Sequence, residues 1–205
     1  TTAEGVVSIG DDAFHGCFRL PSITLPDSVT SIGAKAFYNC NALTDVTLGN
    51  GITSIGSEAF GAFGYKSKVV YQEYDQAKYL GTDDNPYFAL MAVKDTQIAS
   101  CTIHEDTKMI AQAAFYNCPN ITNMAIPNGV IAVDSFAFSE CTALTDVELG
   151  NNLKIIDDHA FYYCTALQSM VIPDSVTSIG EDAFYWCDSL TSVTLPDSVT
   201  TIGDR

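Results

Sequence analysis

The sequence predicts an α/β solenoid, a stack of 23-residue units, from three observations. An Ala-Phe-x-x-Cys motif recurs along the chain, and its phenylalanines are spaced by 23 residues. An alternation of apolar residues precedes most copies of the motif, as expected for a short strand with one buried face. A fixed period of this size is typical of chains in which each unit buries its apolar face against its neighbours. The phenylalanines are Phe14, Phe37, Phe60, Phe115, Phe138, Phe161 and Phe184.

One copy of the unit, residues 167–187, shows how each element follows from the residue types. The apolar alternation at 170–172 predicts a strand, and Pro173 ends that strand and begins a turn. The Val-x-x-Ile-Gly segment at 176–180 predicts a second short extended piece. The spacing by three in Ala-Phe-x-x-Cys at 183–187 predicts a helical or 3₁₀ turn. We therefore expect a curved stack with a parallel β-sheet on one face, and short second strands and 3₁₀ or helical turns on the other.

Cysteine follows most of the motif phenylalanines by three positions. One thiol per unit at one position predicts a ladder with residues about 4.8 Å apart, the strand spacing. That spacing keeps the Cβ atoms further apart than the roughly 3.8 Å that a disulfide prefers. We interpret the ladder as core packing, with disulfides or metal binding as the alternatives. The ladder cysteines are Cys17, Cys40, Cys118, Cys141, Cys164 and Cys187.

Composition narrows the classes of partner. The 205 residues are 47% hydrophobic and carry a formal net charge of −16. An acidic surface disfavours nucleic acid and favours basic or neutral partners. No apolar run approaches the roughly 20 residues of a membrane helix, so we expect no membrane insertion. The chain begins and ends inside a repeat, which indicates a piece of a longer protein. The lack of a signal segment at its start is therefore uninformative.

These spacings predict one repeat solenoid domain over residues 1–205. Regular repeats occupy 1–63 and 98–205, and an irregular, hairpin-like repeat occupies 64–97. Two interpretations of the irregular repeat stay open. It is either a structural splice that keeps the core closed or a binding element, because loops that interrupt repeats often carry function.

Within the irregular repeat, residues 69–74 and 87–93 are expected to form strands, and the turn-rich segment 81–86 lies between them. The stretch holds four of the nine basic residues and half of the ten tyrosines. Tyrosine is frequent at binding hot spots. The candidate partner-binding residues in this stretch are Lys66, Lys68 and Tyr71.

The full pattern L-x-x-V-x-L-P-x-x-V-x-x-I-G-x-x-A-F-x-x-C resembles the BspA-like class of bacterial leucine-rich repeats, found in surface proteins of host-associated and anaerobic bacteria. The resemblance covers most of the chain. It implies an α/β leucine-rich-repeat solenoid that is extracellular, on a bacterial cell surface or secreted. Members of the class are associated with adhesion to host proteins or other cells. The resemblance implies no catalytic residue, so none is carried over.

Two further rows of side chains are candidates for binding. The outward positions of the first strands form a strip of small hydroxyls and carboxylates, which is either a binding surface or an ordinary sheet surface. A second row follows the core phenylalanines and is either packing or a stacking surface for a glycan or protein. The strip candidates are Asp45, Thr47, Asn123, Asp146, Glu148 and Thr194. The second row comprises His15, Tyr38, Tyr116, Tyr162, Tyr163, Tyr185 and Trp186.

The sequence contains no motif for catalysis, metal or cofactor binding. Its three histidines lie in different repeats, and no H-E-x-x-H, G-x-S-x-G or phosphate-loop pattern occurs. We therefore predict a non-catalytic adhesion or protein-interaction module without cofactor, whose partner is a protein or glycan on a host or neighbouring cell. The alternative is a structural spacer within a larger surface protein that carries other domains.

Overall fold

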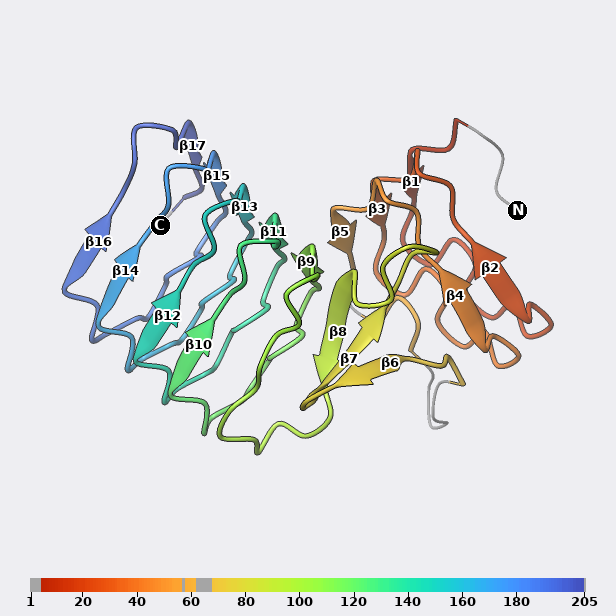
Figure 1. Ribbon diagram of the computed structural model, residues 1–205, viewed down its shortest axis with the longest axis horizontal. Helices are drawn as coiled ribbons and strands as arrows, with labels where there is room; N and C mark the ends of the chain where they lie inside the picture. The colour runs from red at the N-terminus through yellow and green to blue at the C-terminus, as the bar shows by residue number, and fades with distance from the viewer. Residues whose placement is uncertain (1–4, 57, 62–67, 205) are drawn as a thin grey trace. The chain divides into compact units, whose positions relative to one another are not determined.

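The computed structural model describes residues 5–56, 58–61 and 68–204. Over these residues the chain forms short strands joined by turns (Figure 1). The chain divides into two compact units. Unit 1 comprises Thr1–Gln72 and Leu80–Phe88, and unit 2 comprises Glu73–Tyr79 and Ala89–Arg205.

Unit 1 contains two parallel sheets. Strands β2 (Ser22–Thr24) and β4 (Asp45–Thr47) form one, and β1 (Ser8–Ile9), β3 (Ser31–Ile32) and β5 (Ser54–Ile55) form the other. Each residue pairs with the residue 23 positions later, for example Ile23 with Val46. The Val-x-Leu-like strands and the Ser-Ile strands of the repeat therefore both form parallel ladders.

Unit 2 repeats this arrangement. Its first strands are β10 (Asn123–Ala125), β12 (Asp146–Glu148), β14 (Ser169–Val171) and β16 (Ser192–Thr194). Strand β10 pairs with β12 and β14 pairs with β16, both in parallel, and β12 lies beside β14 (Figure 1). In β10, β12 and β14 the middle residue is buried and the two flanking residues are exposed, so these flanking positions form an outward strip as predicted.

The second strands form the longer ladder. Their eight-stranded sheet has the order β17-β15-β13-β11-β9-β8-β7-β6, and β17 to β8 pair in parallel from neighbour to neighbour. The predicted parallel sheet is thus confirmed, although its longest continuous part lies in the second strands. The strands are β6 (Gln72–Tyr74), β7 (Ala77–Leu80), β8 (Ala89–Val93), β9 (Met109–Ile110), β11 (Ala132–Val133), β13 (Ile155–Ile156), β15 (Ser178–Ile179) and β17 (Thr201–Ile202).

The Ala-Phe-x-x-Cys segments are not helical, which corrects the prediction of helical or 3₁₀ turns and of an α/β class. The described residues contain strands and turns but no helix. In each segment a residue two positions before or after the phenylalanine has a left-handed backbone, such as His159 at φ 56° and Tyr163 at φ 60° around Phe161. A left-handed residue breaks a right-handed helix at once. These residues are Asp12, Gly16, Lys35, Asn39, Glu58, Ala113, Asn117, Phe136, Glu140, His159, Tyr163, Asp182 and Trp186.

Successive N–H groups of these turns bond in alternating directions. The Phe161 N–H donates to the Ala183 carbonyl of the next repeat at 2.8 Å, whereas the Tyr162 N–H donates to the His159 carbonyl of its own turn at 3.0 Å. Half of the donors thus close local turns, and the other half join neighbouring repeats. This pattern explains the spacing by three without a helix, because a β-turn also closes over three residues.

Stacked phenylalanines form the centre of both units. In unit 2, Phe115, Phe138 and Phe161 are fully buried, and the ring centroids of Phe138 and Phe161 lie 5.2 Å apart with an interplanar angle of 3°. In unit 1, Phe37 stacks between Phe14 and Phe60 at 5.0 and 5.2 Å. The 23-residue spacing of the motif phenylalanines thus corresponds to a stack of rings. Phe184 stacks on Phe161 at 5.5 Å but is only half-buried.

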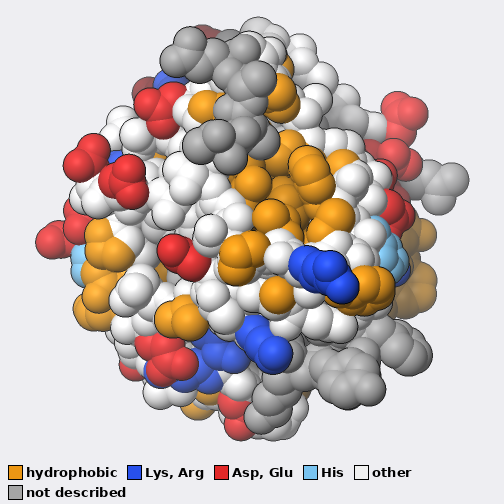
Figure 2. All heavy atoms as spheres, turned by 90° about the vertical axis from the view of Figure 1, so that its right-hand side faces the viewer, with side chains coloured by type: hydrophobic (Ala, Val, Ile, Leu, Met, Phe, Trp, Pro, Cys, Tyr) orange, Lys and Arg blue, Asp and Glu red, His pale blue; other side chains and the backbone are white. Residues whose placement is uncertain are grey.

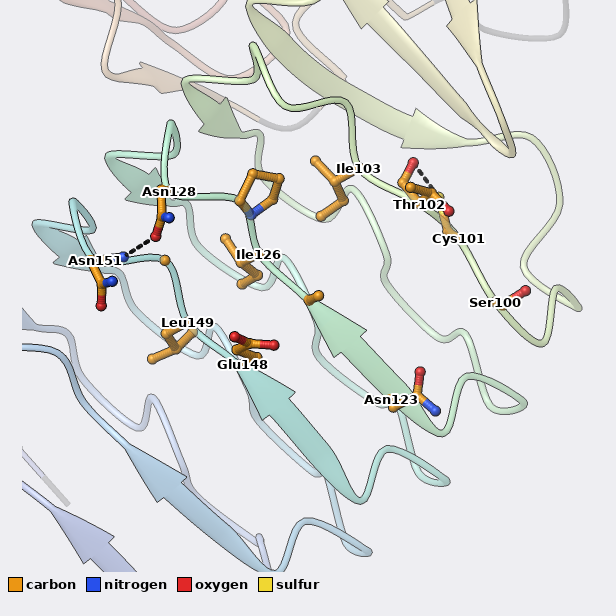
Figure 3. A pocket seen from close by; sticks show the side chains of 13 residues that line it. Ser100, Cys101, Thr102, Ile103, Asn123, Ile126, Asn128, Glu148, Leu149 and Asn151 are labelled. Atoms are coloured by element: carbon orange, nitrogen blue, oxygen red, sulfur yellow. Dashed lines mark hydrogen bonds between the residues drawn. The ribbon is translucent and has the colours of Figure 1, made fainter.

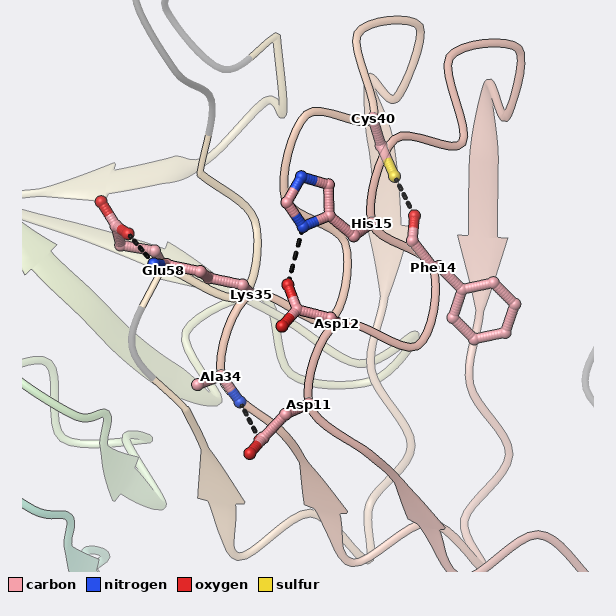
Figure 4. Close-up of polar contacts among 8 residues, drawn as sticks. All are labelled: Asp11, Asp12, Phe14, His15, Ala34, Lys35, Cys40 and Glu58. Carbon is pink, nitrogen blue, oxygen red and sulfur yellow. Dashed lines mark hydrogen bonds and ion pairs between the residues drawn. The ribbon is translucent and has the colours of Figure 1, made fainter.

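The cysteine ladder packs against these turns. Cys40, Cys118, Cys141, Cys164 and Cys187 are buried free thiols, and Cys17 is half-buried. The Cys40 Sγ donates to the Phe14 carbonyl at 3.1 Å (Figure 4), and Cys141, Cys164 and Cys187 make the equivalent bond to the phenylalanine 26 residues earlier. The ladder therefore has the packing role that the spacing predicts.

Polar contacts between turns follow the same period. In unit 1 the Asp11 carboxylate accepts the Ala34 N–H at 2.8 Å, and Lys35 lies 3.7 Å from Glu58 (Figure 4). In unit 2 the Asp158 carboxylate accepts the Glu181 N–H at 2.7 Å in the same way. The carboxylates that open the turns thus bind backbone N–H groups of the next repeat.

The irregular repeat contains one strand that the sequence analysis missed. Strands β6 and β8 lie within the predicted 69–74 and 87–93 segments, and the turn at 81–86 is closed by the Thr82 N–H and the Asn85 carbonyl at 3.0 Å. Between them, β7 follows a tight turn at Asp75 and Gln76 and places Tyr79 fully inside. Burial raises the pKa of Tyr79 to about 12. The Tyr79 hydroxyl accepts the His104 N–H at 3.2 Å, which ties the irregular repeat to the regular one that follows.

Candidate functional site

The strip side chains of unit 2 lie in register on the outer face of the first strands. Asn123 pairs with Asp146, and Ala125 pairs with Glu148. Further along, Val171 pairs with Thr194. The strip is fixed by the alternation of the strands, because each buried middle residue turns its two neighbours outward. The structure thus brings the candidates Asn123, Asp146 and Glu148 together.

Unit 1 carries a separate, shorter strip. Asp45 is exposed and pairs with Ser22, while Thr47 is partly exposed and pairs with Thr24. Lys68 is exposed and Tyr71 partly exposed in the segment that precedes β6. Lys66 lies outside the described residues. The sequence-predicted candidates therefore fall into a set in unit 1 and a set in unit 2.

A groove of about 510 Å³ crosses the unit 2 strip (Figure 3). One side is formed by residues 100–103, the floor by the end of β10, and the other side by the end of β12 with Glu148. Of the predicted candidates, Asn123 and Glu148 line this groove. The other lining residues include Asn128 and Asn151, which sequence reasoning missed.

The two asparagines hold the end of the groove. The Asn151 N–H donates to the Asn128 Oδ1 at 2.8 Å (Figure 3). The Asn152 side chain donates to the Asn128 carbonyl at 2.9 Å. Both follow the residue that ends the strand, Pro127 or Gly150, where asparagine side chains readily bond nearby backbone. The recurrence of Asn or Asp directly after the Pro or Gly that follows each first strand was the signal that could have identified them.

Cys101 also lines the groove, but its thiol keeps its proton. Burial, with a smaller contribution from the charge of Asp75, raises the pKa of Cys101 to about 11. The thiolate is the nucleophilic form of cysteine. At neutral pH this thiol is therefore suited to contact rather than to nucleophilic attack.

The histidines do not converge on a common site. His15 Nδ1 lies 2.7 Å from Asp12 Oδ1 (Figure 4), His104 Nδ1 lies 3.7 Å from Asp106 Oδ2, and His159 Nε2 lies 3.5 Å from Asp182 Oδ2. Each histidine thus lies close to one carboxylate, and the three histidine–carboxylate pairs lie in different repeats. Within the described ranges, no group of three or more His, Cys, Asp or Glu side chains is placed to hold a metal ion. The same ranges contain no helix able to cross a bilayer.

Hydrophobic surface gathers elsewhere on unit 1. Val7 and Phe18 are 58% and 63% exposed. Figure 2 looks at the side of the molecule that carries β2 in Figure 1, and it shows hydrophobic side chains gathered in one area of that face. This area contrasts with the polar outward positions of β2 and β4.

In-register parallel strands, a buried phenylalanine stack and a 23-residue period define a leucine-rich-repeat protein. A family model described as the BspA type leucine rich repeat region matches residues 1–76 and 91–205. The chain therefore belongs to the BspA-type leucine-rich-repeat family, as the resemblance in its sequence predicts. A comparison with curated proteins finds no match.

Two solved structures, with TM-scores above 0.5, share the fold. The pneumococcal vaccine antigen PcpA is 21% identical with a TM-score of 0.58, and the match covers 98% of this chain and 59% of that one. A leucine-rich repeat protein from Bacteroides ovatus is 24% identical with a TM-score of 0.51, covering 100% of this chain and 46% of that one. A leucine rich cell surface protein from Faecalibacterium prausnitzii is 26% identical with a TM-score of 0.48, covering 90% and 62%. This chain thus spans less than two thirds of each of these three proteins.

Proposed function

We propose that this chain is a non-catalytic interaction module of a bacterial cell-surface or secreted protein, which binds an extended protein or glycan along the strip of unit 2. The observation that carries the proposal is the in-register placement of Asn123 beside Asp146 and of Ala125 beside Glu148, next to a groove of about 510 Å³. Rows of outward side chains one strand spacing apart, about 4.8 Å, suit a ligand that makes repeated contacts.

The chemistry of the strip supports contact rather than reaction. Carboxylates and amides line it, and the Cys101 thiol in the groove keeps its proton. The histidines are distributed over separate turns. An extracellular location is proposed from membership of the BspA-like class, which is found in bacterial surface proteins.

One observation favours the alternative of a structural spacer. The outward positions of the first strands hold Ser, Thr, Asp, Asn, Ala, Val and Glu, and none of them is Trp, Tyr or Arg, the residues most frequent at binding hot spots. Small hydroxyl side chains also suit a plain pleated surface. A spacer would hold other domains of a longer protein away from the cell.

Binding to arrays of host-matrix proteins and bacterial-surface glycans distinguishes the two functions. The unmodified chain is expected to bind at micromolar concentration, less strongly as salt screens its carboxylates. The variant Asp146→Lys/Glu148→Lys should lose that binding. The control Glu181→Lys/Asp204→Lys makes the same change of charge at exposed sites away from the first strands and should retain it. If the unmodified chain binds nothing in either array, the spacer function replaces the adhesion function.

A further inference from the structure

The groove that crosses the unit 2 strip contains one formal charge, the carboxylate of Glu148. Its lining residues include three asparagines, a serine and a threonine, but no Lys, Arg or His and no second Asp or Glu. In Figure 3 the Glu148 side chain lies near the middle of the labelled lining residues. The ion pairs found among the described residues do not include Glu148. The charge of the groove is therefore negative and uncompensated.

Glu148 is held on a paired strand in the interior of unit 2. It pairs with Ala125 of β10, and the Ile126 N–H donates to the Glu148 carbonyl at 2.8 Å. Residues 100–103 lie on one side of the groove, and β14 lies beyond β12 on the other. The groove is thus bounded by neighbouring repeats on both sides, and its carboxylate has a fixed place.

Apolar surface lies next to this carboxylate. Ala125 is exposed in the groove, and Pro127 and Cys101 are half-buried in its lining. Lysine and arginine cover such surface with their methylene stems while the charged head reaches a polar partner. The groove volume of about 510 Å³ lies within the range of ligand pockets, roughly 300–1,000 Å³. An apolar floor beside one carboxylate therefore fits a basic side chain.

The asparagine amides of the groove suit the backbone of a peptide. The Asn128 Oδ1 accepts the Asn151 N–H at 2.8 Å, so the Asn128 amide can offer its two N–H groups to a ligand. The Asn123 amide nitrogen lies 3.5 Å from the Thr122 Oγ1, and its oxygen is an acceptor. Each peptide unit carries one N–H donor and one C=O acceptor, which are complementary to these groups.

The charge of Glu148 distinguishes a basic ligand from a neutral one. A ligand that fills the groove displaces water from the carboxylate, and covering a charge is unfavourable unless a partner replaces that water. The basic residues of 98–204 are Lys108 and Lys154, and neither lines the groove. A neutral glycan would leave the charge uncompensated, whereas an ammonium or guanidinium would balance it.

We infer that the groove binds a lysine or arginine side chain of an extended partner segment, with Glu148 as its counter-ion and the asparagine amides as contacts for the segment's backbone. The inference rests on the proposed function and names its ligand as a basic protein segment rather than a neutral glycan. It also assigns the ends of β10 and β12 as the part of the strip that the basic side chain contacts.

Titration with an octa-lysine peptide tests the inference, followed by nitrogen-15 NMR of the side-chain amides of Asn123, Asn128 and Asn151. We expect these resonances to shift saturably. Glu148→Gln keeps the length of the side chain and removes its charge, and should weaken the binding about two- to five-fold, the size of one exposed ion pair. Glu181→Gln removes the same charge at an exposed site outside the groove lining and should leave the binding unchanged.

Three outcomes would overturn the inference. Octa-lysine that shifts none of the three amide resonances would remove the site. Equal weakening by Glu148→Gln and Glu181→Gln would reduce the interaction to the general acidity of the chain. Shifts with the neutral hexasaccharide laminarihexaose, and none with octa-lysine, would assign the groove to glycans, so that the proposed function would stand and only its ligand class would fall. If the arrays also show no binding, the proposed function fails as well.

Discussion

Cys164 donates its thiol hydrogen to the carbonyl of Phe138, with 3.1 Å between the two heavy atoms. Both residues are fully buried, so this bond joins the cysteine ladder to the phenylalanine stack of the preceding repeat. The Phe138 N–H bonds onward to the Ala160 carbonyl at 2.8 Å. The Phe138 backbone is therefore hydrogen-bonded to the next repeat through both its carbonyl and its N–H, and the Cys164 thiol is enclosed.

We expect thiol labelling of the native protein to be slow and graded. The half-buried Cys17 should react first, whereas the five buried ladder cysteines should resist the reagent because only exposed thiolate reacts. In denaturant all seven cysteines should label quickly, as counted by mass spectrometry. Thiols that stay unlabelled after complete unfolding would reveal disulfides and contradict the ladder.

Stability should fall at alkaline pH. Burial raises the pKa of Cys187 to about 11 from an ordinary value of 9.0, and burial likewise raises the pKa of Cys164. Between pH 9 and pH 11 the Cys187 thiol of the unfolded chain has lost its proton, whereas that of the folded chain keeps it. The free energy of unfolding therefore decreases as pH rises from about 9 to 11. Urea unfolding across this range checks the trend, and Cys187→Ala should reduce its slope. A flat profile would show that these thiols ionise alike in both states.

Replacing Phe161 by Ala should lower the free energy of unfolding by about 3–5 kcal/mol, the usual range for a buried phenylalanine. Phe161 is fully buried and stacks on rings at 5.2 and 5.5 Å. Phe18→Ala, at a 63% exposed site, is the control and should change stability by less than about 0.5 kcal/mol. Similar losses at the two sites in chemical denaturation would mean that the stack is not the centre of the core.

The left-handed turn positions can be tested with two glycine substitutions that should change the stability in opposite directions. Ala113 has φ 58°, so Ala113→Gly should stabilise the protein by up to about 1 kcal/mol, because glycine adopts this backbone without strain. Ala114, its neighbour, is buried and absent from the left-handed set, so Ala114→Gly should destabilise it by roughly 0.5–1 kcal/mol or more. Thermal unfolding of the pair measures the difference. Destabilisation by both changes would argue against the left-handed turn.

The repeat core was predictable from the sequence because the same residue types recur at the same positions of each repeat. Phe138, Cys141 and Leu144 recur at fixed offsets, and each proves fully buried. The shape of the turn was not predictable, since a spacing by three fits both a helical turn and successive β-turns. The left-handed positions gave little help, because Lys35, Glu58 and Ala113 have no preference for that backbone.

The candidate site was predictable only in part. Alternation along the strands placed Asn123 and Glu148 outward, and both line the groove. Residues 100–103 also line it, although their sequence follows the template weakly. Strand β7 was missed because its apolar residues, Ala77, Tyr79 and Leu80, alternate too briefly to distinguish it from a loop.

The pairing of each residue with the one 23 positions later has a genetic consequence. Ser135 could be followed directly by His159, since a deletion of residues 136–158 would place Phe161 where Phe138 now stacks on Phe115 and would keep every remaining ladder in register. A duplication of the same length would be tolerated for the same reason. Unequal recombination between repeats can therefore lengthen or shorten such a protein in whole steps of about 4.8 Å. The length of the stack can then change during evolution while the packing of its core stays the same.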